Sequence, residues 1–267
     1  MLTIGFICLI FGCFSGLLAG LFGLGGGLIL VPFFIALFEY QQFPASLIML
    51  MAVATSLATV MITASIATLT QHRLGTIIWR YVFHLSAGIS VGVIAGSLMT
   101  QYIEPKQLRL LFALYMLYTS AKMILPTPQL VTTAQILSTL KLKCSGLGIG
   151  FMSVLIGIGG GSLTVPLLIK YQLSMPKAIA ISSACGFPIA VLASISYIIL
   201  GWQTPNLPAG CFGYIYLPAF IGISISSLFF TPIGAKLANT LPTQQLKRGF
   251  AVLLLIVAGK LIYAVFY

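Results

Sequence analysis

Apolar residues fill long blocks of the chain, and short polar or glycine-rich stretches separate these blocks. Almost every window of about twenty residues is apolar enough to fill the hydrocarbon core of a bilayer. The blocks cover approximately residues 2–21, 28–38, 44–70, 78–100, 107–125, 145–157, 162–173, 177–200, 212–235 and 247–267. The pattern predicts an all-α polytopic membrane protein with short loops.

A glycine-rich motif occurs twice in the same context. The first copy reads Phe22-Gly-Leu-Gly-Gly-Gly27 and is followed by Pro32. The second copy, 134 residues further on, reads Ile156-Gly-Ile-Gly-Gly-Gly161 and is followed by Pro166. We therefore predict one membrane unit repeated. The first repeat is residues 1–126, the inter-repeat loop is 127–143, and the second repeat is 144–267.

Each predicted repeat begins with two apolar pieces that flank the glycines. Most of these pieces, such as 28–38 and 162–173, are too short to cross a core of about 30 Å at 1.5 Å per residue. Each repeat is therefore expected to start with a re-entrant or glycine-broken helix pair, which contributes an even number of crossings. Three transmembrane helices follow in each repeat. Each repeat therefore crosses the membrane an odd number of times, and the two repeats are expected to insert with inverted topology.

The distribution of positive charge supports this arrangement. Inverted repeats place ten of the 13 Lys and Arg residues on one side of the membrane, whereas a single crossing at each glycine segment divides them almost evenly. Because cytoplasmic loops are enriched in Lys and Arg, both termini are expected to face away from the cytoplasm. The minority side receives Lys106, Arg109 and Lys260.

Composition excludes several classes of function. Only 6% of the residues are charged, so no stretch is polar enough for a separate soluble catalytic domain. Glu39 and Glu104 are the only acidic residues, which excludes carboxylate cages for Ca²⁺ or Mg²⁺ and paired-carboxylate chemistry. The five cysteines show no CxxC spacing. The net charge of +11 is scattered singly or in pairs, so nucleic acid is not an expected partner.

The glycine motifs are the main candidate for a binding site. Adjacent glycines expose backbone N–H groups and allow positive φ, and the helix that resumes after them presents its positive dipole end to an anion. The alternative is that glycines only permit close helix packing, as we expect for Gly88, Gly92 and Gly96. A dinucleotide loop fits poorly, because neither copy completes GxGxxG. The predicted substrate-binding residues here are Gly25, Gly26, Gly27, Pro32, Gly159, Gly160, Gly161 and Pro166.

Hydroxyl pairs follow each motif at Thr55-Ser56 and Ser182-Ser183. Hydroxyls can donate to a substrate oxygen without the desolvation cost of a buried charge, so Thr55, Ser56, Ser182 and Ser183 complete the predicted anion site. Bonding to helix carbonyls is the equally weighted alternative.

His72 could carry a coupling proton, because the ordinary pKa of histidine lies near neutral pH. The alternative is an interfacial anchor with Arg73 and Trp79. His84 is expected to be a hydrogen-bonded core residue.

At these residues the chain resembles the sulfite exporter TauE/SafE family, also called the 4-toluene sulfonate uptake permease family. The resemblance spans nearly the whole sequence. It is carried by the segments from Ser15-Gly16 to Gly27, Val31-Pro32, Ala54 to Leu57, His72-Arg73 to Gly75, Gly159 to Gly161, Val165-Pro166, and Gly213 to Pro218. The family often has Thr-Ser where this chain has Ser182-Ser183, which leaves the hydroxyl in place.

The resemblance implies a multi-pass inner-membrane transporter of small sulfur-containing anions such as sulfite, sulfonates or sulfoacetate. The expected mechanism is alternating access driven by an ion gradient, with H⁺ or Na⁺ as the coupling ion. A passive anion channel is the alternative. An enzyme is not expected, because the sequence shows no recognisable nucleophile–base pair and no cluster of metal-ligand residues. We expect no cofactor and no metal. The expected partners are the anion, the lipid bilayer and, in one arrangement, a second copy in a homodimer.

Overall fold

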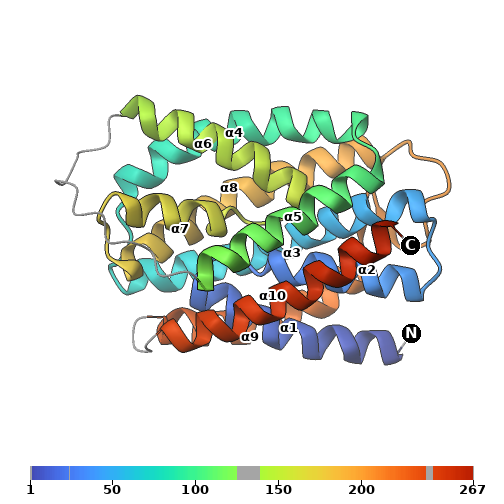
Figure 1. Cartoon of the computed structure of the whole chain (residues 1–267), viewed down its shortest axis with the longest axis horizontal. Coiled ribbons are helices and arrows are strands. Elements are labelled where there is room, and N and C mark those ends of the chain that lie inside the picture. Colours follow the sequence, from blue (N-terminus) through green and yellow to red (C-terminus); the bar gives the residue numbers. More distant parts are fainter. Residues whose placement is uncertain (1, 24, 125–138, 239–242, 267) are drawn as a thin grey trace.

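The computed structural model describes the fold of residues 2–23, 25–124, 139–238 and 243–266. Within these ranges the chain is almost entirely helical (Figure 1). The helices are α1 (Leu2–Phe22), α2 (Gly27–Tyr40), α3 (Ala45–Arg73), α4 (Trp79–Met99), the 3-10 turn η1 (Thr100–Tyr102), α5 (Pro105–Ile124), α6 (Thr139–Ile156), α7 (Gly161–Lys170), α8 (Met175–Gly201), α9 (Leu217–Leu237) and α10 (Thr243–Phe266). Most of the inter-repeat loop predicted at 127–143 lies outside the described residues.

Five of the described helical segments are long and apolar enough to cross a membrane. They are Ala45–Arg73, Trp79–Tyr102, Thr139–Ile156, Met175–Gly201 and Leu217–Leu237. By contrast, α2 and α7 have 14 and 10 residues. At 1.5 Å per residue they span only about 21 and 15 Å. The composition and length of the helices thus agree with an all-α multi-pass membrane protein.

The structure differs from the predicted segments in two places. Residues 211–216, expected at the start of a membrane segment, form a short antiparallel hairpin of β1 (Cys211–Phe212) and β2 (Ile215–Tyr216). Gly213 makes the turn with φ of +57°, and Pro218 lies in the first turn of α9, where its missing N–H costs no hydrogen bond. In addition, α6 begins at Thr139, so residues 139–143, expected in a loop, are helical.

Both halves of the chain contain the same order of elements: a helix, a glycine break, a short helix, a long helix and two further helices. The first helix of each half packs against the fourth helix of the other half, so α1 contacts α9 and α6 contacts α4. The long helices α3 and α8 contact each other, and α5 contacts α10. Figure 1 shows both termini at the same end of the bundle, where α1 begins, whereas α6 begins at the opposite end.

Small residues set the distance between the paired helices. A Cβ atom on Gly88 would lie 1.9 Å from the carbonyl oxygen of Lys143, and one on Gly92 would lie 2.1 Å from that of Leu147. On the other side of the molecule, a Cβ on Gly20 would lie 2.2 Å from the Thr231 carbonyl oxygen. These backbones touch, which requires the absence of a side chain. The predicted packing role of Gly88, Gly92 and Gly96 is confirmed, since a Cβ on Gly96 would also clash.

Two alanine substitutions test this packing. Gly92→Ala places a methyl group against α6 and should cost on the order of 1–3 kcal/mol through overpacking. Gly148→Ala is the matched control, because a Cβ at this exposed α6 position meets nothing within 4 Å. Where no contact is disturbed, replacing a helical glycine by alanine stabilises the helix by about 1 kcal/mol. Thermal unfolding in detergent should show a lower midpoint for Gly92→Ala only, and equal midpoints would contradict the close α4–α6 contact.

Candidate functional site: two glycine breaks in contact

The first glycine break separates α1 from α2. Gly23, Gly25 and Gly26 adopt positive φ values of 64°, 68° and 80°. Gly26 is the N-cap of α2 and lies in the left-handed region, with ψ of −11°. Residues with a side chain rarely adopt this conformation, so the sequence of adjacent glycines is what allows the chain to reverse here.

The second glycine break separates α6 from α7 and repeats this geometry. Gly157 and Gly160 have φ of 79° and 74°, and Gly160 is the left-handed N-cap of α7. Gly26 and Gly160 have no side chain to cap the helices, and only their carbonyl oxygens accept hydrogen bonds, from the N–H groups of the third and fourth helical residues. Both helices therefore begin without a side-chain cap and present a positive dipole end.

The prolines lie one and a half turns into the short helices. Pro32 is the sixth residue of α2 and Pro166 the sixth residue of α7, and both are half-buried. Proline has no N–H, so neither can donate to the carbonyl four residues earlier, at Leu28 and Ser162. Each proline thus removes one hydrogen bond from the start of its helix.

The two breaks lie against each other. A Cβ atom on Gly27 would be 2.4 Å from the carbonyl oxygen of Gly157 and 2.9 Å from the Cα of Ile158. A Cβ on Gly25 would be 3.4 Å from the Cα of Gly159. Segments from the two halves of the chain thus meet backbone to backbone, with the Gly157 carbonyl beside the start of α2.

Serine hydroxyls tie each break to the long helix of the other half. Ser56 on α3 donates its Oγ hydrogen to the carbonyl oxygen of Gly157, at 2.9 Å. Ser182 on α8 donates to the carbonyl oxygen of Gly23, at 3.0 Å. Both serines are fully buried. The structure therefore places Ser56 and Ser182 at the breaks, in equivalent roles on opposite halves.

The other member of each hydroxyl pair has a different role. Thr55 is buried, and its Oγ1 accepts a hydrogen bond from the Tyr216 N–H at 3.1 Å, so it fixes the hairpin before α9. Ser183 donates to the Ile179 carbonyl of its own helix at 3.0 Å, yet it lines the space between the breaks. Thr55 and Ser183 thus have different roles at the breaks, although each is the sequence neighbour of a serine that bonds a break, Ser56 or Ser182.

A narrow space lies between the breaks and the central helices. None of the described residues that line it is charged, and it is too small to hold a water molecule. The breaks are therefore closed in this conformation. The residues around the space are Ala19, Gly23, Gly25, Thr63, Ala64, Ala67, Gly159, Ser183 and Gly186.

Sequence reasoning missed two polar residues at the breaks. Thr63 donates its Oγ1 hydrogen to the Gly25 carbonyl oxygen at 3.0 Å. It lies seven residues after Ser56 and hence on the same helix face, a spacing that could have identified it. Ser153 is 1% exposed and has no hydrogen-bond partner among the described residues. A Cβ on Gly160 would lie 3.3 Å from its Oγ, so this free hydroxyl faces the second break.

The two histidines lie away from the breaks. His72 is exposed at the end of α3, with its ring edge against Trp79 at 5.6 Å between centroids. It follows Thr63 by nine residues, roughly 13 Å along the helix. The half-buried His84 has its Nδ1 2.6 Å from the Arg80 carbonyl oxygen, within its own helix. The structure therefore does not bring His72 together with the glycine segments.

Metal chemistry has no obvious site at the breaks. Across the described ranges, no three His, Cys, Asp or Glu side chains gather to hold a metal ion. The ion pair of Arg109 with Glu39 joins α5 to the end of α2 and lies outside the space between the breaks. What the site offers is a set of backbone N–H groups, carbonyl oxygens and neutral hydroxyls.

Comparison with known proteins identifies the relatives of this chain. The family model described as sulfite exporter TauE/SafE matches residues 8–261. A "probable membrane transporter protein" of Haemophilus influenzae is 37% identical over 258 residues, which cover 97% of this chain and 98% of that protein. A protein of the same description from Methanocaldococcus jannaschii is 28% identical, with 90% and 89% of the two chains covered.

A third relative is the "probable membrane transporter protein YunE" of Bacillus subtilis, which is 24% identical with 96% and 97% of the two chains covered. No solved structure matches the chain at a significant level. The family model and the relatives agree over nearly the whole length, and the helices described above are those of a multi-pass membrane protein. The chain belongs to the sulfite exporter TauE/SafE family of membrane transporters.

Proposed function

We propose that this protein transports a small sulfur-containing anion, such as sulfite or a sulfonate, by alternating access at the two glycine breaks. The observation that carries the proposal is the direct contact between the breaks, in which the start of α2 lies beside the Gly157 carbonyl. We expect an anion to meet the helix end beside this contact. Substrate binding then requires the breaks to part.

The chemistry of the parted site suits an anion. The first-turn N–H groups of α2 and α7 supply donors and positive dipole ends without a charged side chain. Ser56, Ser182 and the unpartnered Ser153 supply hydroxyl donors. An anion held by neutral donors avoids the desolvation cost of a buried Lys or Arg and can leave again, as transport requires.

We propose that the two halves are repeats of inverted topology. Support comes from the reciprocal helix pairs, from the reciprocal serine bonds, and from α1 and α6 beginning at opposite ends of the bundle (Figure 1). Both termini would then face away from the cytoplasm. The last helix residues Arg73 and Lys170 fall on the proposed cytoplasmic side, together with Lys236 near the end of α9.

Alternating access follows from this arrangement. The close-packed pairs α1–α9 and α4–α6, each of which joins the two halves, would move as units. Parting the two breaks disrupts the hydrogen bonds from Ser56 to Gly157 and from Ser182 to Gly23, each of which contributes about 1 kcal/mol. Bonds of this size hold the closed state but still allow it to open. The bound anion replaces them with its own oxygen atoms on one side of the membrane at a time.

The driving force for this proposed transport comes from outside the breaks. An interior-negative potential favours anion export by about 2.3 kcal/mol per charge per 100 mV. Because no acidic residue and no histidine is among the described residues that line the space between the breaks, a coupling proton would travel on the substrate, since sulfite is itself a weak acid. His72 is then an interfacial residue beside Trp79 rather than the proton carrier.

Substitution of the capping glycines tests the site. Gly26→Val and Gly160→Val place a branched side chain at φ near +80° and +74°, and should reduce sulfite efflux from proteoliposomes at least tenfold. Gly148→Val, at an open position of α6, is the matched control and should retain flux. Membrane insertion is checked for each variant. Normal efflux by both cap variants would remove the breaks from the mechanism.

Cysteine accessibility tests the inverted topology. Tyr40 and Lys170 are the exposed last residues of α2 and α7, which are equivalent helices of the two halves. In a variant without the five native cysteines, a membrane-impermeant maleimide should label Tyr40→Cys in intact cells and Lys170→Cys only after the membrane is opened. The exposed Leu74→Cys should behave like Lys170→Cys. Labelling of Tyr40→Cys and Lys170→Cys from the same side would show parallel repeats.

A further inference from the structure

The two glycine breaks share their backbone geometry but differ in the side chains around them. A Cβ atom on Gly160 would lie 3.3 Å from the Oγ of Ser153. At the equivalent place in the first half, a Cβ on Gly26 would lie 3.6 Å from the Cβ of Ala19. Ser153 follows Ala19 by 134 residues, which is also the offset between the two glycine motifs. The same packing position thus carries a hydroxyl beside α7 and a methyl group beside α2.

A pair of hydroxyls lies at the start of α7. Ser162 is the second residue of this helix, and its Oγ is hydrogen-bonded to the phenolic oxygen of the buried Tyr115 on α5. Either atom can be the donor. One hydroxyl hydrogen forms the bond, so the other can be donated to a ligand.

Apolar residues replace this pair in the other half of the chain. Leu28 is the second residue of α2, as Ser162 is of α7, and it is buried. The Phe-Ala pair at 112–113 of α5 recurs 138 residues later on α10, and this offset matches Tyr115 with Leu253. The start of α7 is therefore accompanied by hydroxyl-bearing residues, whereas their counterparts for α2 are hydrocarbon.

The hydroxyls near the breaks also differ in whether the protein uses them. Ser182 and Thr63 reach the first break, but they donate to the carbonyl oxygens of that break. Ser153 is buried and has no hydrogen-bond partner among the described residues. Because leaving a buried hydroxyl unpaired is costly, Ser153 marks a place where a ligand is expected to bind.

The backbone at the start of α7 favours an anionic ligand. The Gly160 carbonyl oxygen accepts hydrogen bonds from the N–H groups of the third and fourth residues of the helix. The N–H groups of Gly161 and Ser162 are left without an acceptor in the helix. These donors lie at the positive dipole end, where an anion is stabilised.

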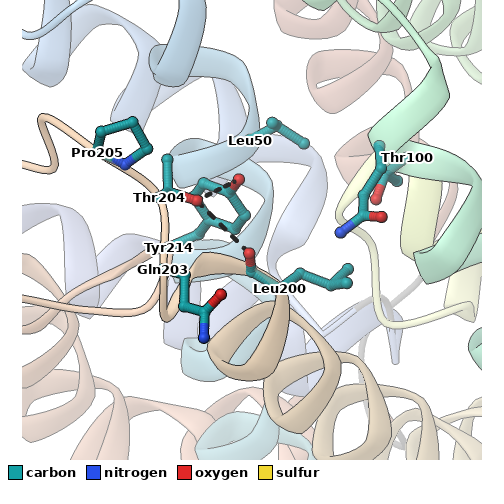
Figure 2. A pocket seen from close by; sticks show the side chains of 8 residues that line it. Leu50, Thr100, Leu200, Gln203, Thr204, Pro205 and Tyr214 are labelled. Atoms are coloured by element: carbon teal, nitrogen blue, oxygen red, sulfur yellow. Dashed lines mark hydrogen bonds between the residues drawn. The ribbon is translucent and has the colours of Figure 1, made fainter.

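A cavity of about 390 Å³ at the end of α8 lacks this combination (Figure 2). There Thr204 donates its Oγ1 hydrogen to the Tyr214 hydroxyl at 2.9 Å, and the side chains of Gln101 and Gln203 are exposed. None of the described residues that line it has a buried polar atom without a partner. This cavity therefore does not select a ligand as the start of α7 does.

We infer that the start of α7, rather than that of α2, holds the oxygen atoms of the transported anion, with Tyr115, Ser153 and Ser162 as its specificity-determining residues. The inference rests on the proposed transport function and assigns recognition to one of the two breaks. When the breaks part, the three side chains donate hydrogen bonds to an anion that lies at the positive end of α7. The start of α2 contributes backbone groups alone, because Ala19 and Leu28 lie beside it.

Deletion of single hydroxyls tests this assignment. Ser153→Ala, Ser162→Ala and Tyr115→Phe should each raise the half-saturation concentration of sulfite efflux about tenfold, because each removes one hydrogen bond to a charged ligand. The maximal rate should change less. Unfolding midpoints without anion confirm that each variant is folded.

Two matched variants remove a hydroxyl elsewhere. Tyr118→Phe changes an exposed ring of α5, and Ser90→Ala changes a half-buried serine of α4 whose hydroxyl bonds its own helix. Both should keep the half-saturation concentration of the unchanged protein. Values for the three site variants equal to those of Tyr118→Phe and Ser90→Ala would overturn the inference.

Thermal stabilisation by anions separates this inference from the proposed transport. In detergent, at least one of sulfite, sulfate, phosphate and nitrate should raise the unfolding midpoint of the unchanged protein and of Ser90→Ala, and should raise that of Ser153→Ala less. Stabilisation that depends on Ser153, without flux of any sulfur oxyanion, would keep the site at α7 and remove the transport of sulfur anions. Saturable sulfite flux that is unchanged in all three site variants would keep the transporter and remove the site.

Discussion

The structure depends on how broken helices satisfy their backbone hydrogen bonds inside a membrane. A glycine break in the middle of an apolar bundle frees carbonyl and N–H groups that lipid cannot hydrate. Here the carbonyl oxygens of Gly23 and Gly157 accept hydrogen bonds from Ser182 and Ser56, and that of Gly25 accepts one from Thr63. Because Ser56 and Ser182 lie in the opposite half from the break they satisfy, neither break can be completed within its own half, and the two halves must meet.

Close packing of small residues makes this meeting possible. Glycines on α4 bring this helix into backbone contact with α6, and glycines on α1 bring that helix into backbone contact with α9. The long helices α3 and α8 contact each other in the interior between these two pairs. These two helices carry the hydroxyls that reach the breaks. An outer layer of close-packed helix pairs thus flanks an inner site held closed by a few hydrogen bonds. Because each outer pair joins a helix of one half to a helix of the other, the proposed opening of the breaks moves these pairs as units and parts only the weaker inner contacts.

Much of the fold could be predicted from the sequence, because apolar blocks and glycine–proline breaks mark helices directly. The short helices α2 and α7 and the packing glycines of α4 followed from such local signals. The hairpin before α9 did not, since Cys211 to Tyr216 read as apolar sequence and Gly213 gave the only hint of a turn. The sequence identifies Ser56 and Ser182 as candidates and the structure places both at the breaks, but the separate role of Thr55 depends on contact with Tyr216, 161 residues away. Long-range contacts of this kind leave no local pattern.

A reversible cross-link between the halves tests the central claim most directly. A Cβ on Gly186 would lie 3.4 Å from the Cβ of Ala64, close to the separation of about 3.8 Å in a disulfide, and these residues join α8 to α3 beside the breaks. In a variant without native cysteines, Ala64→Cys with Gly186→Cys should lose saturable efflux of a small sulfonate, which unlike sulfite does not cleave disulfides, when oxidised and regain it when reduced. Undiminished efflux from the oxidised, cross-linked protein would contradict transport through parting of the two breaks.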